Sequence, residues 1–424
     1  MIKINFKNIL EVDGAHGLSQ SEIDFSSEDI KSALLKIHER KQGFYEILDD
    51  AETILKINDF ANSVKNKYKY IVVLGIGGSA LGTITLQKSL KHEYGCQLAH
   101  NPQLFVLDNI DPDYIKEVEE VLDLTQTLFI VVSKSGNTVE TLSQYFYFRK
   151  KIETLDLLVK DHFVFITDPQ TGLLRETANA EGIKSFKIPE NVGGRFSVLT
   201  PVSLLPARLM GLQIGDLIDG AKLARDKFLS LDPTENLPYL FAKLQHGLYQ
   251  KGKVLNVMMP YSNKLAPVTE WYSQLLAESI GKDGIGITPI EAKGVTDQHS
   301  QNQLYHDGPN DKLIVFVEVE NFKNKLDIPN YYPEHPAVSY LGKTSFNELI
   351  ALEAQGTQDS LTAKDRPNLK LSVPNLTEKS LGELFFMLEA SIAFLGELFK
   401  VNAYDQPGVE LSKQLTKKYY ERKA

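Results

Sequence analysis

The feature that most constrains the fold is a series of short apolar runs in the first half of the chain. They cover residues 70–74, 104–107, 128–132 and 163–167, and each leads into a polar or glycine-rich loop and then into helical periodicity. Strands this apolar are buried on both faces, and their alternation with helices is typical of a parallel sheet. We therefore predict a helix-covered parallel sheet in this part of the chain.

A second series of apolar runs begins at KVLNVMM, near residue 253. It continues with KLIVFVEV at 312–319 and LKLSV at 369–373. The intervening WYSQLLAES and the long GELFFMLEASIAFLGELFKV have helical periodicity. A chain of 424 residues is too long for one ordinary core, so the two series indicate two α/β domains.

The first domain is predicted to cover residues 45–205 and the second residues 206–424. The first 67 residues have mostly amphipathic helical patterns, with Ser27 as the N-cap of one helix. We expect the N-terminal helices, residues 1–44, to pack on the second domain.

The composition excludes some classes of partner. The chain carries 46 Lys and Arg against 55 Asp and Glu, a net charge of −9, which argues against nucleic acid or a membrane as the main partner. Cys96 is the single cysteine, so no internal disulfide can form and a reducing compartment is expected. The N-terminal MIKINFKNIL lacks the apolar core of a signal peptide, and no stretch is long and apolar enough for a membrane span. We predict a cytoplasmic protein.

Residues 71–83, IVVLGIGGSALGT, place a glycine-rich loop directly after the first apolar run. Gly75, Gly77 and Ala80 satisfy the loose dinucleotide fingerprint G-x-G-x-x-G/A, and Asp108 follows the next run, where an acidic residue could hold a ribose. A nicotinamide-dependent dehydrogenase is therefore one hypothesis. The fingerprint alone is weak evidence, and Asp108 lies somewhat far along the chain for that role.

A second loop follows the run at 128–132, and a helix is predicted to begin near its end. The loop residues are Ser133, Lys134, Ser135, Gly136, Asn137 and Thr138. Small hydroxyl and amide side chains at a strand-to-helix turn leave backbone N–H groups open, and the helix N-terminus favours an oxyanion such as phosphate. Ser79 occupies the matching place in the first loop. The alternative is that these hydroxyls only cap helices, which stabilises each helix by about 1 kcal/mol.

The two loops together favour a phosphate-bearing ligand over a dinucleotide. Parallel strands end at one edge of a sheet, so both loops are expected to face one crevice. A nicotinamide cofactor needs one glycine loop and gives no reason for a second loop of Ser and Thr beside it.

Six segments, in the same order, resemble those of the glucose-6-phosphate isomerase (phosphoglucose isomerase) family. GIGGSALG at 75–82 and SKSGNTVET at 133–141 resemble its two phosphate loops, and ENVGGRFSV at 190–198 and DQPGVELSKQ at 405–414 resemble its two signature segments. ESIGK at 278–282 resembles the segment with its base, and GVTDQHSQNQL at 294–304 resembles the segment with its histidine. The chain departs from the family at Ser135, where many members have Thr, and at Pro407, where larger members have Trp.

This resemblance implies a fold of two αβα sandwich domains with mostly parallel sheets, a homodimer, and neither a metal nor an organic cofactor. It implies reversible isomerisation of D-glucose 6-phosphate and D-fructose 6-phosphate, by ring opening and proton transfer through a cis-enediolate. In that family the reaction serves glycolysis and gluconeogenesis.

Glu278 is the predicted base. It lies four residues after Gln274 on a predicted helix, so both side chains project from one face, and it precedes Gly281, a predicted helix stop. A carboxylate there meets the negative end of the helix dipole, which is unusual for a structural residue and useful for a base. From the residues alone, a solvated helical Glu is the alternative. The resemblance assigns Glu278 to proton transfer.

Arg195, His299 and Lys413 complete the predicted catalytic set. Two glycines before Arg195 let the backbone approach a ligand, and the resemblance places Arg195 at the enediolate oxygen; the alternative is an interdomain salt bridge. The resemblance makes His299 the ring-opening residue, supplied by the neighbouring subunit, whereas His306 suits a helix end. Lys413 lies three residues after Glu410, as in a surface ion pair, but the resemblance assigns it to the proton of the ring oxygen.

The predicted substrate-binding residues come from the two loops and from two glutamines. They are Gly78, Ser79, Ser133, Lys134, Ser135, Gly136, Asn137, Thr138, Gln274 and Gln406. A non-catalytic sugar-phosphate sensor with this fold is a second hypothesis, and the joint presence of a base, a histidine, an arginine and a lysine argues against it. The nearest enzymatic alternative is a dual isomerase that also takes mannose 6-phosphate.

Overall fold

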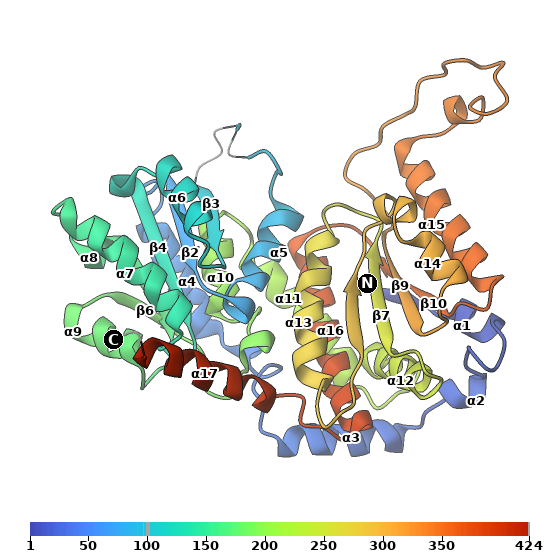
Figure 1. Cartoon of the computed structure of the whole chain (residues 1–424), viewed down its shortest axis with the longest axis horizontal. Coiled ribbons are helices and arrows are strands. Elements are labelled where there is room, and N and C mark those ends of the chain that lie inside the picture. The colour runs from blue at the N-terminus through green and yellow to red at the C-terminus, as the bar shows by residue number, and fades with distance from the viewer. Residues whose placement is uncertain (96, 99–101, 423–424) are drawn as a thin grey trace.

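The computed structural model describes residues 1–95, 97–98 and 102–422, so the predicted free cysteine, Cys96, lies outside the described residues. It contains two five-stranded sheets, with the helices α5, α11, α13 and α16 between them (Figure 1). Other helices cover the outer face of each sheet (Figure 1). The predicted α/β fold with mostly parallel sheets is confirmed.

The first sheet is parallel throughout and has the order β3-β2-β4-β5-β6. Its strands are β2 (Tyr70–Leu74), β3 (Gln103–Leu107), β4 (Thr127–Ser133), β5 (Phe163–Thr167) and β6 (Lys184–Lys187). The helices of this half are α4 (Ala51–Ser63), α5 (Leu81–Leu90), α6 (Pro112–Val121), α7 (Val139–Thr154), α8 (Val159–His162), α9 (Leu173–Glu181) and α10 (Pro201–Leu209). The edge strand β6 was not predicted, because only Phe186 is buried in it and no continuous apolar run marks it.

The central strands of this sheet are buried on both faces, as their continuous apolar runs predict. In β2, Ile71 and Val73 belong to the large cluster that also contains Met258 of the second sheet. Val72 and Leu74 point the other way, into a smaller cluster covered by α7. The inner faces of the two sheets therefore share one core.

The second sheet has the order β1-β10-β9-β7-β8, in which β1 pairs antiparallel with β10 and the other pairs are parallel. Its strands are β1 (Lys3–Asn5), β7 (Leu255–Pro260), β8 (Thr288–Glu291), β9 (Lys312–Val319) and β10 (Asn368–Val373). The remaining helices are α1 (Lys7–Glu11), α2 (Gln20–Ile23), α3 (Ser27–Glu39), α11 (Ile214–Leu229), α12 (Leu237–Gln250), α13 (Ala266–Ile280), α14 (Asn302–Asp307), α15 (Phe346–Thr362), α16 (Glu378–Phe399) and α17 (Glu410–Glu421).

The N-terminal region differs from its prediction in two respects. Residues 3–5 form the strand β1 and not a helix, because β10 offers them a free edge; a run this short has no periodicity to read. The N-cap of α3 is Ser26 and not Ser27, since Ser26 Oγ accepts the hydrogen bond of Asp29 N in a capping box. Both α2 and α3 pack on second-half helices, α12 and α16 respectively. The exact boundary between the predicted domains stays a prediction.

No helix in the described part of the chain combines the length and the apolar composition that a membrane crossing needs.

Candidate active site

The two predicted phosphate loops begin side by side at the carboxyl edge of the first sheet. The 3₁₀ turn η2 (Gly77–Ser79) follows β2, and residues 133–138 follow β4, the parallel neighbour of β2. The chain continues from β2 to β3 on one side, whereas β4 lies on the other. Ligands of open parallel sheets bind at such a switch point, because the diverging connections leave a crevice there.

The hydroxyl groups of the second loop bind within the loop and not to the helix that follows. Ser133 Oγ and Thr138 Oγ1 lie 2.8 Å apart, and Ser135 Oγ accepts a hydrogen bond from Asn137 N at 3.2 Å. Thr138 is the N-cap residue of α7, yet its side chain makes no capping hydrogen bond. The capping alternative is therefore not realised at Thr138, and the N-terminus of a 16-residue helix has no side-chain cap to compete with an anion.

Two other residues of this loop connect it to neighbouring segments. Lys134 Nζ donates to the carbonyls of Glu190 and Val192 at 2.9 and 2.8 Å, and burial lowers the pKa of this ammonium. Asn137 Oδ1 accepts a hydrogen bond from Leu173 N, in the first turn of α9, at 3.0 Å. These contacts tie the loop to α9 and to the segment that leads into the 3₁₀ turn η4 (Gly194–Phe196).

The glycines of the first loop accommodate neighbouring parts of the protein. A Cβ atom on Gly78 would lie 2.4 Å from the Gly194 carbonyl oxygen and 2.9 Å from Arg195 N. Gly77 has a φ of +56°, and a Cβ atom there would lie 3.0 Å from Gln274 Nε2. The loop thus packs by its backbone against η4 and faces α13. Its glycine content is explained without a dinucleotide.

Arg195 lies at the centre of the site with all of its hydrogen-bond donors occupied. The residue is 3% exposed. Its acceptors are Ser279 Oγ at 2.7 Å from Nε, Glu278 Oε2 at 3.0 Å and Gln406 Oε1 at 3.1 Å from Nη1, and the carbonyls of Ala403 at 2.6 Å and Asp405 at 2.9 Å from Nη2. A guanidinium has five N–H groups, so each has an acceptor. Burial lowers the pKa of Arg195, and the adjacent Glu278 carboxylate opposes that shift.

Glu278 is held on one side and open on the other. It lies near the end of α13, and Gly281 follows as the C-cap, as predicted. Oε1 accepts a hydrogen bond from Gln274 Nε2, one turn earlier, at 3.0 Å, while Oε2 binds Arg195. The side chain of Glu278 remains 34% exposed, against 2% for that of Arg195. A carboxylate oriented by two donors and still accessible can exchange a proton with a ligand.

The pair of Arg195 and Glu278 also joins the two halves of the molecule. Arg195 follows the last strand of the first sheet, and Glu278 lies on the helix that follows β7 of the second. An ion pair between the parts of the chain that carry the two sheets is therefore present, as the salt-bridge alternative for Arg195 expects, and the same contact orients Glu278. The predicted role of Arg195 at an enediolate oxygen stays a prediction.

His299 and Lys413 lie outside this cluster. His299 ends the 3₁₀ turn η5 (Thr296–His299) and is exposed. Lys413 pairs with Glu410 at 2.8 Å on α17, a helix in which no residue is buried. Figure 1 shows α17, in dark red, along the lower side of the first half of the molecule. Within the described residues, neither side chain contacts Glu278 or Arg195, so one chain assembles only part of the predicted catalytic set.

Ser279, Lys282 and Asp405 belong to the site although no role was predicted for them. Ser279 binds Arg195 through its hydroxyl, and Lys282 Nζ pairs with Asp405 Oδ1 at 3.0 Å. The three residues lie inside the segments ESIGK and DQPGVELSKQ. Their position in those segments was the available signal, but nothing local in the sequence indicates that the two segments meet.

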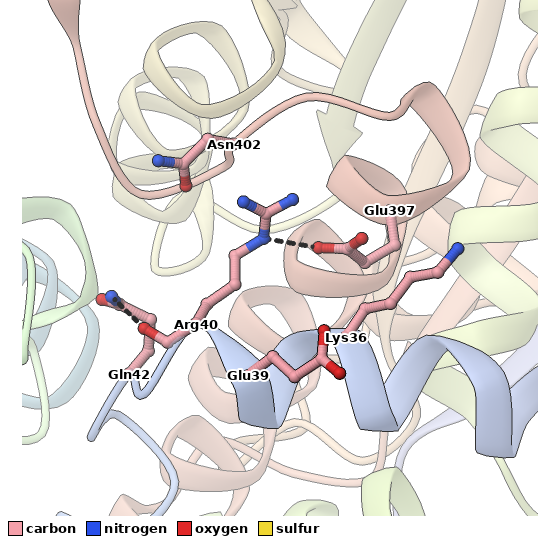
Figure 2. A pocket seen from close by; sticks show the side chains of 6 residues that line it. All are labelled: Lys36, Glu39, Arg40, Gln42, Glu397 and Asn402. Atoms are coloured by element: carbon pink, nitrogen blue, oxygen red, sulfur yellow. Dashed lines mark hydrogen bonds and ion pairs between the residues drawn. The ribbon is translucent and has the colours of Figure 1, made fainter.

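A separate polar pocket of about 410 Å³ lies beside the segment that carries Asp405 (Figure 2). It is lined by Lys36, Glu39, Arg40, Gln42, Glu397 and Asn402. Arg40 Nε donates to Glu397 Oε1 at 2.8 Å, which ties the end of α16 to the end of α3. None of the predicted site residues lines this pocket. Nowhere in the described chain do three His, Cys, Asp or Glu side chains come together as a metal site requires.

Comparisons with known proteins agree over nearly the whole chain. The family model for phosphoglucose isomerase matches residues 40–423. A glucose-6-phosphate isomerase from Carboxydothermus hydrogenoformans is 41% identical, over 98% of this chain and 94% of its own length. The crystal structure of a hypothetical protein from Thermus thermophilus superposes with a TM-score of 0.88 at 34% identity, over 99% of this chain and 100% of that one. A glucose-6-phosphate isomerase from Chlamydia trachomatis has a TM-score of 0.75 at 26% identity, over 87% of this chain and 73% of that one.

The contact between the first loop and η4 predicts unequal effects of two glycine substitutions. Gly78→Ala is expected to destabilise the protein by about 1–3 kcal/mol, the usual cost of overpacking, because its Cβ atom would meet the Gly194 carbonyl. Gly193→Ala is the matched control: the nearest atoms to its Cβ would lie at 3.8 and 3.9 Å, so its stability should stay within about 0.5 kcal/mol. Urea unfolding measures both. Equal midpoints would contradict the close backbone packing.

Proposed function

This chain belongs to the phosphoglucose isomerase family, and we propose that it interconverts D-glucose 6-phosphate and D-fructose 6-phosphate with Glu278 as the base. The observation that carries this proposal is the position of the Glu278 carboxylate, bound by Gln274 and Arg195 and open on its remaining side. The site lies where the first phosphate loop, η4 and α13 meet. We place the reaction in the cytoplasm, in glycolysis and gluconeogenesis.

The isomerisation needs no external oxidant, since C2 is oxidised as C1 is reduced. After the ring opens, Glu278 removes the proton from C2, a C1–C2 double bond forms, and the carbonyl oxygen on C1 takes up the negative charge. Glu278 then returns the proton to C1, while the proton on O2 passes to O1 and C2 becomes the carbonyl carbon. A single carboxylate serves both steps because C1 and C2 are adjacent on one face of the planar enediolate.

Arg195 is suited to stabilise the charge that develops on the oxygens. Its Nη1 group binds the side chains of Glu278 and Gln406, whereas its other donors bind Ser279 and main-chain carbonyls. An enediolate oxygen can replace Gln406 as an acceptor of Nη1 and leave the other bonds intact. A buried cation that is already oriented stabilises an anionic transition state with little reorganisation.

The second loop is the proposed site of the substrate phosphate. The uncapped N-terminus of α7 supplies N–H groups and the positive end of a helix dipole. The hydroxyls of Ser133 and Thr138, which bind each other, can both turn to phosphate oxygens. Ser79 lies at the start of the neighbouring loop, on the same sheet edge.

We further propose that ring opening uses His299 and Lys413 once the site is complete. Both side chains are exposed in a single chain, and the ion pair of Lys413 with Glu410 lies at the surface, so each can approach a ligand bound elsewhere. In a homodimer, His299 of one subunit would enter the site of the other. Lys413 follows Gln406 on the same C-terminal segment, and Gln406 already contacts Arg195.

Loss of the Glu278 carboxylate is expected to abolish most of the activity and leave binding intact. Glu278→Gln keeps the shape of the side chain and removes its basicity, so kcat should fall by at least about 10²–10⁴-fold. Affinity for a five-carbon aldonate phosphate, an enediolate mimic, should remain. Glu270→Gln, on the exposed side of the same helix, is the matched control and should keep wild-type kcat. A Glu278→Gln enzyme within tenfold of wild type would show that the base lies elsewhere.

The phosphate assignment predicts a change in KM. The Ser133→Ala/Thr138→Ala variant loses two hydroxyls that are proposed to bind the charged group, each worth about 1.5–3 kcal/mol, so KM should rise at least about 100-fold with kcat affected much less. Inorganic phosphate should compete with substrate in the wild type and more weakly in the variant. Ser143→Ala is the control, since Ser143 Oγ bonds Val139 O at 2.8 Å inside α7. An unchanged KM in the double variant would refute the assignment.

A shared site predicts complementation between inactive subunits. Mixed dimers of His299→Ala and Glu278→Gln chains contain one site with both residues intact, so they should recover up to about half of the activity of a wild-type dimer. The mixed dimer is isolated with two affinity tags, and each variant alone is the control. Absence of recovery in purified mixed dimers would argue that His299 acts within its own subunit.

A further inference from the structure

Lys282 makes a second set of contacts between α13 and the C-terminal segment, next to those of Arg195. Its ammonium donates to the Ser279 carbonyl at 3.1 Å, to Asp405 Oδ1 at 3.0 Å and to the carbonyl of Asn402. An ammonium has three N–H groups, so each has an acceptor. The Lys282 side chain is 8% exposed, so its ammonium is enclosed while the Asp405 carboxylate reaches the surface.

Lys282 and Arg195 hold the same two residues from different sides. The hydroxyl of Ser279 accepts a hydrogen bond from Arg195 Nε, and its carbonyl accepts one from Lys282 Nζ. The carbonyl of Asp405 accepts a hydrogen bond from Arg195 Nη2, and its carboxylate pairs with the Lys282 ammonium. The second carboxylate oxygen of Asp405 accepts Asn402 Nδ2 at 2.8 Å. The two cations therefore fix the end of α13 and the C-terminal segment relative to each other.

Burial cannot fix the position of this segment, because it has no apolar anchor beyond Tyr404. Every residue from 405 to 422 is exposed, and the Asp405 side chain is 51% exposed. Polar contacts must therefore set where Gln406 lies, and Gln406 is one of the two side chains on Arg195 Nη1. Of the contacts that Arg195 makes with this segment, the one to Gln406 is the one that an enediolate oxygen would replace, so the position of Gln406 then depends on the other contacts of the segment.

The backbone of Lys282 is itself well defined. Its N–H donates to the Ile285 carbonyl at 3.0 Å, and Ile285 N donates back to the Lys282 carbonyl at 2.9 Å. This tight turn directly follows Gly281, the C-cap of α13. A side chain that starts from a closed turn and ends on three acceptors has little freedom, so it can act as a rigid spacer.

We propose that Lys282 is a positioning residue of the isomerase. By joining Ser279, Asn402 and Asp405, it fixes the positions of Gln406 and of the Arg195 N–H groups relative to the Glu278 carboxylate. This inference rests on the proposed function. Among the described residues Lys282 makes no hydrogen bond or ion pair with Glu278, and the proposed role is exerted through Asp405 and Ser279. Errors of about 1 Å in the position of catalytic groups cost about 10²-fold in rate, so its loss should lower kcat.

The test compares Lys282→Met, Lys282→Arg and Asp405→Ala with wild type in one coupled assay. Lys282→Met keeps the length of the stem and removes the ammonium, and we expect kcat to fall about 10–100-fold. KM and the inhibition constant of inorganic phosphate should stay within about threefold, because the phosphate loops belong to the first sheet. Lys282→Arg, which retains the charge, should recover a large part of kcat. Asp405→Ala removes an exposed side chain, so it should fold and lower kcat in the same direction.

Lys264→Met is the matched control at the other end of α13. Lys264 Nζ also binds two main-chain carbonyls, those of Lys88 and Lys91, and lies 3.9 Å from the Glu93 carboxylate. This variant should keep wild-type kcat even if its thermal midpoint falls. Equal losses of kcat in Lys264→Met and Lys282→Met would overturn the proposal, because a general loss of stability would explain both.

Two further outcomes separate this inference from the function on which it rests. If wild-type protein turns over fructose 6-phosphate and both Lys282→Met and Asp405→Ala remain within about threefold of it, the positioning role is refuted and the proposed function stands. If wild-type protein gives no turnover, the proposed function fails, and the positioning role fails with it.

Discussion

The structure depends on one buried guanidinium, that of Arg195, whose N–H groups all have hydrogen-bond acceptors. Arg195 is almost fully enclosed, and a buried cation is tolerated only when its donors have acceptors and its charge has a partner. Its acceptors come from α13 and from the C-terminal segment, while Arg195 itself follows the first sheet. A single side chain thereby brings together three parts of the chain that are distant in sequence.

That arrangement accounts for the geometry of the site. The first loop can approach Arg195 closely because Gly78 has no side chain to meet Gly194. Gln274 lies next to Gly77 and reaches Glu278 one turn along α13. The same contacts that close the boundary between the halves therefore orient the Glu278 carboxylate. The proposed function therefore couples stability and catalysis at this boundary, and a substitution there should be measured for kcat and KM as well as for stability.

Several residues that the sequence predicts to contact a ligand also hold the second loop in place. Lys134 connects the second loop to main-chain carbonyls at 190 and 192, and Asn137 binds the start of α9. The loop hydroxyls of Ser133 and Thr138 differ, because they bind one another and cap no helix end. A loop whose backbone is held by its longer side chains and whose hydroxyls need only turn is well suited to bind phosphate without backbone rearrangement.

Sequence alone determined the central strands of both sheets and the candidate site residues. Strands buried on both faces need unbroken apolar runs, so the central strands could be predicted, whereas the edge strands β1, β6 and β8 bury few side chains and leave no such run. The motifs indicated Glu278, Arg195 and the phosphate loops. Only the tertiary structure decided which acceptors surround Arg195 and that Lys282 reaches Asp405. The contacts of Arg195 with Glu278 and Gln406 join residues 83 and 211 positions apart, and a buried cation finds its acceptors only after the packing of both sheets has brought them within hydrogen-bonding distance.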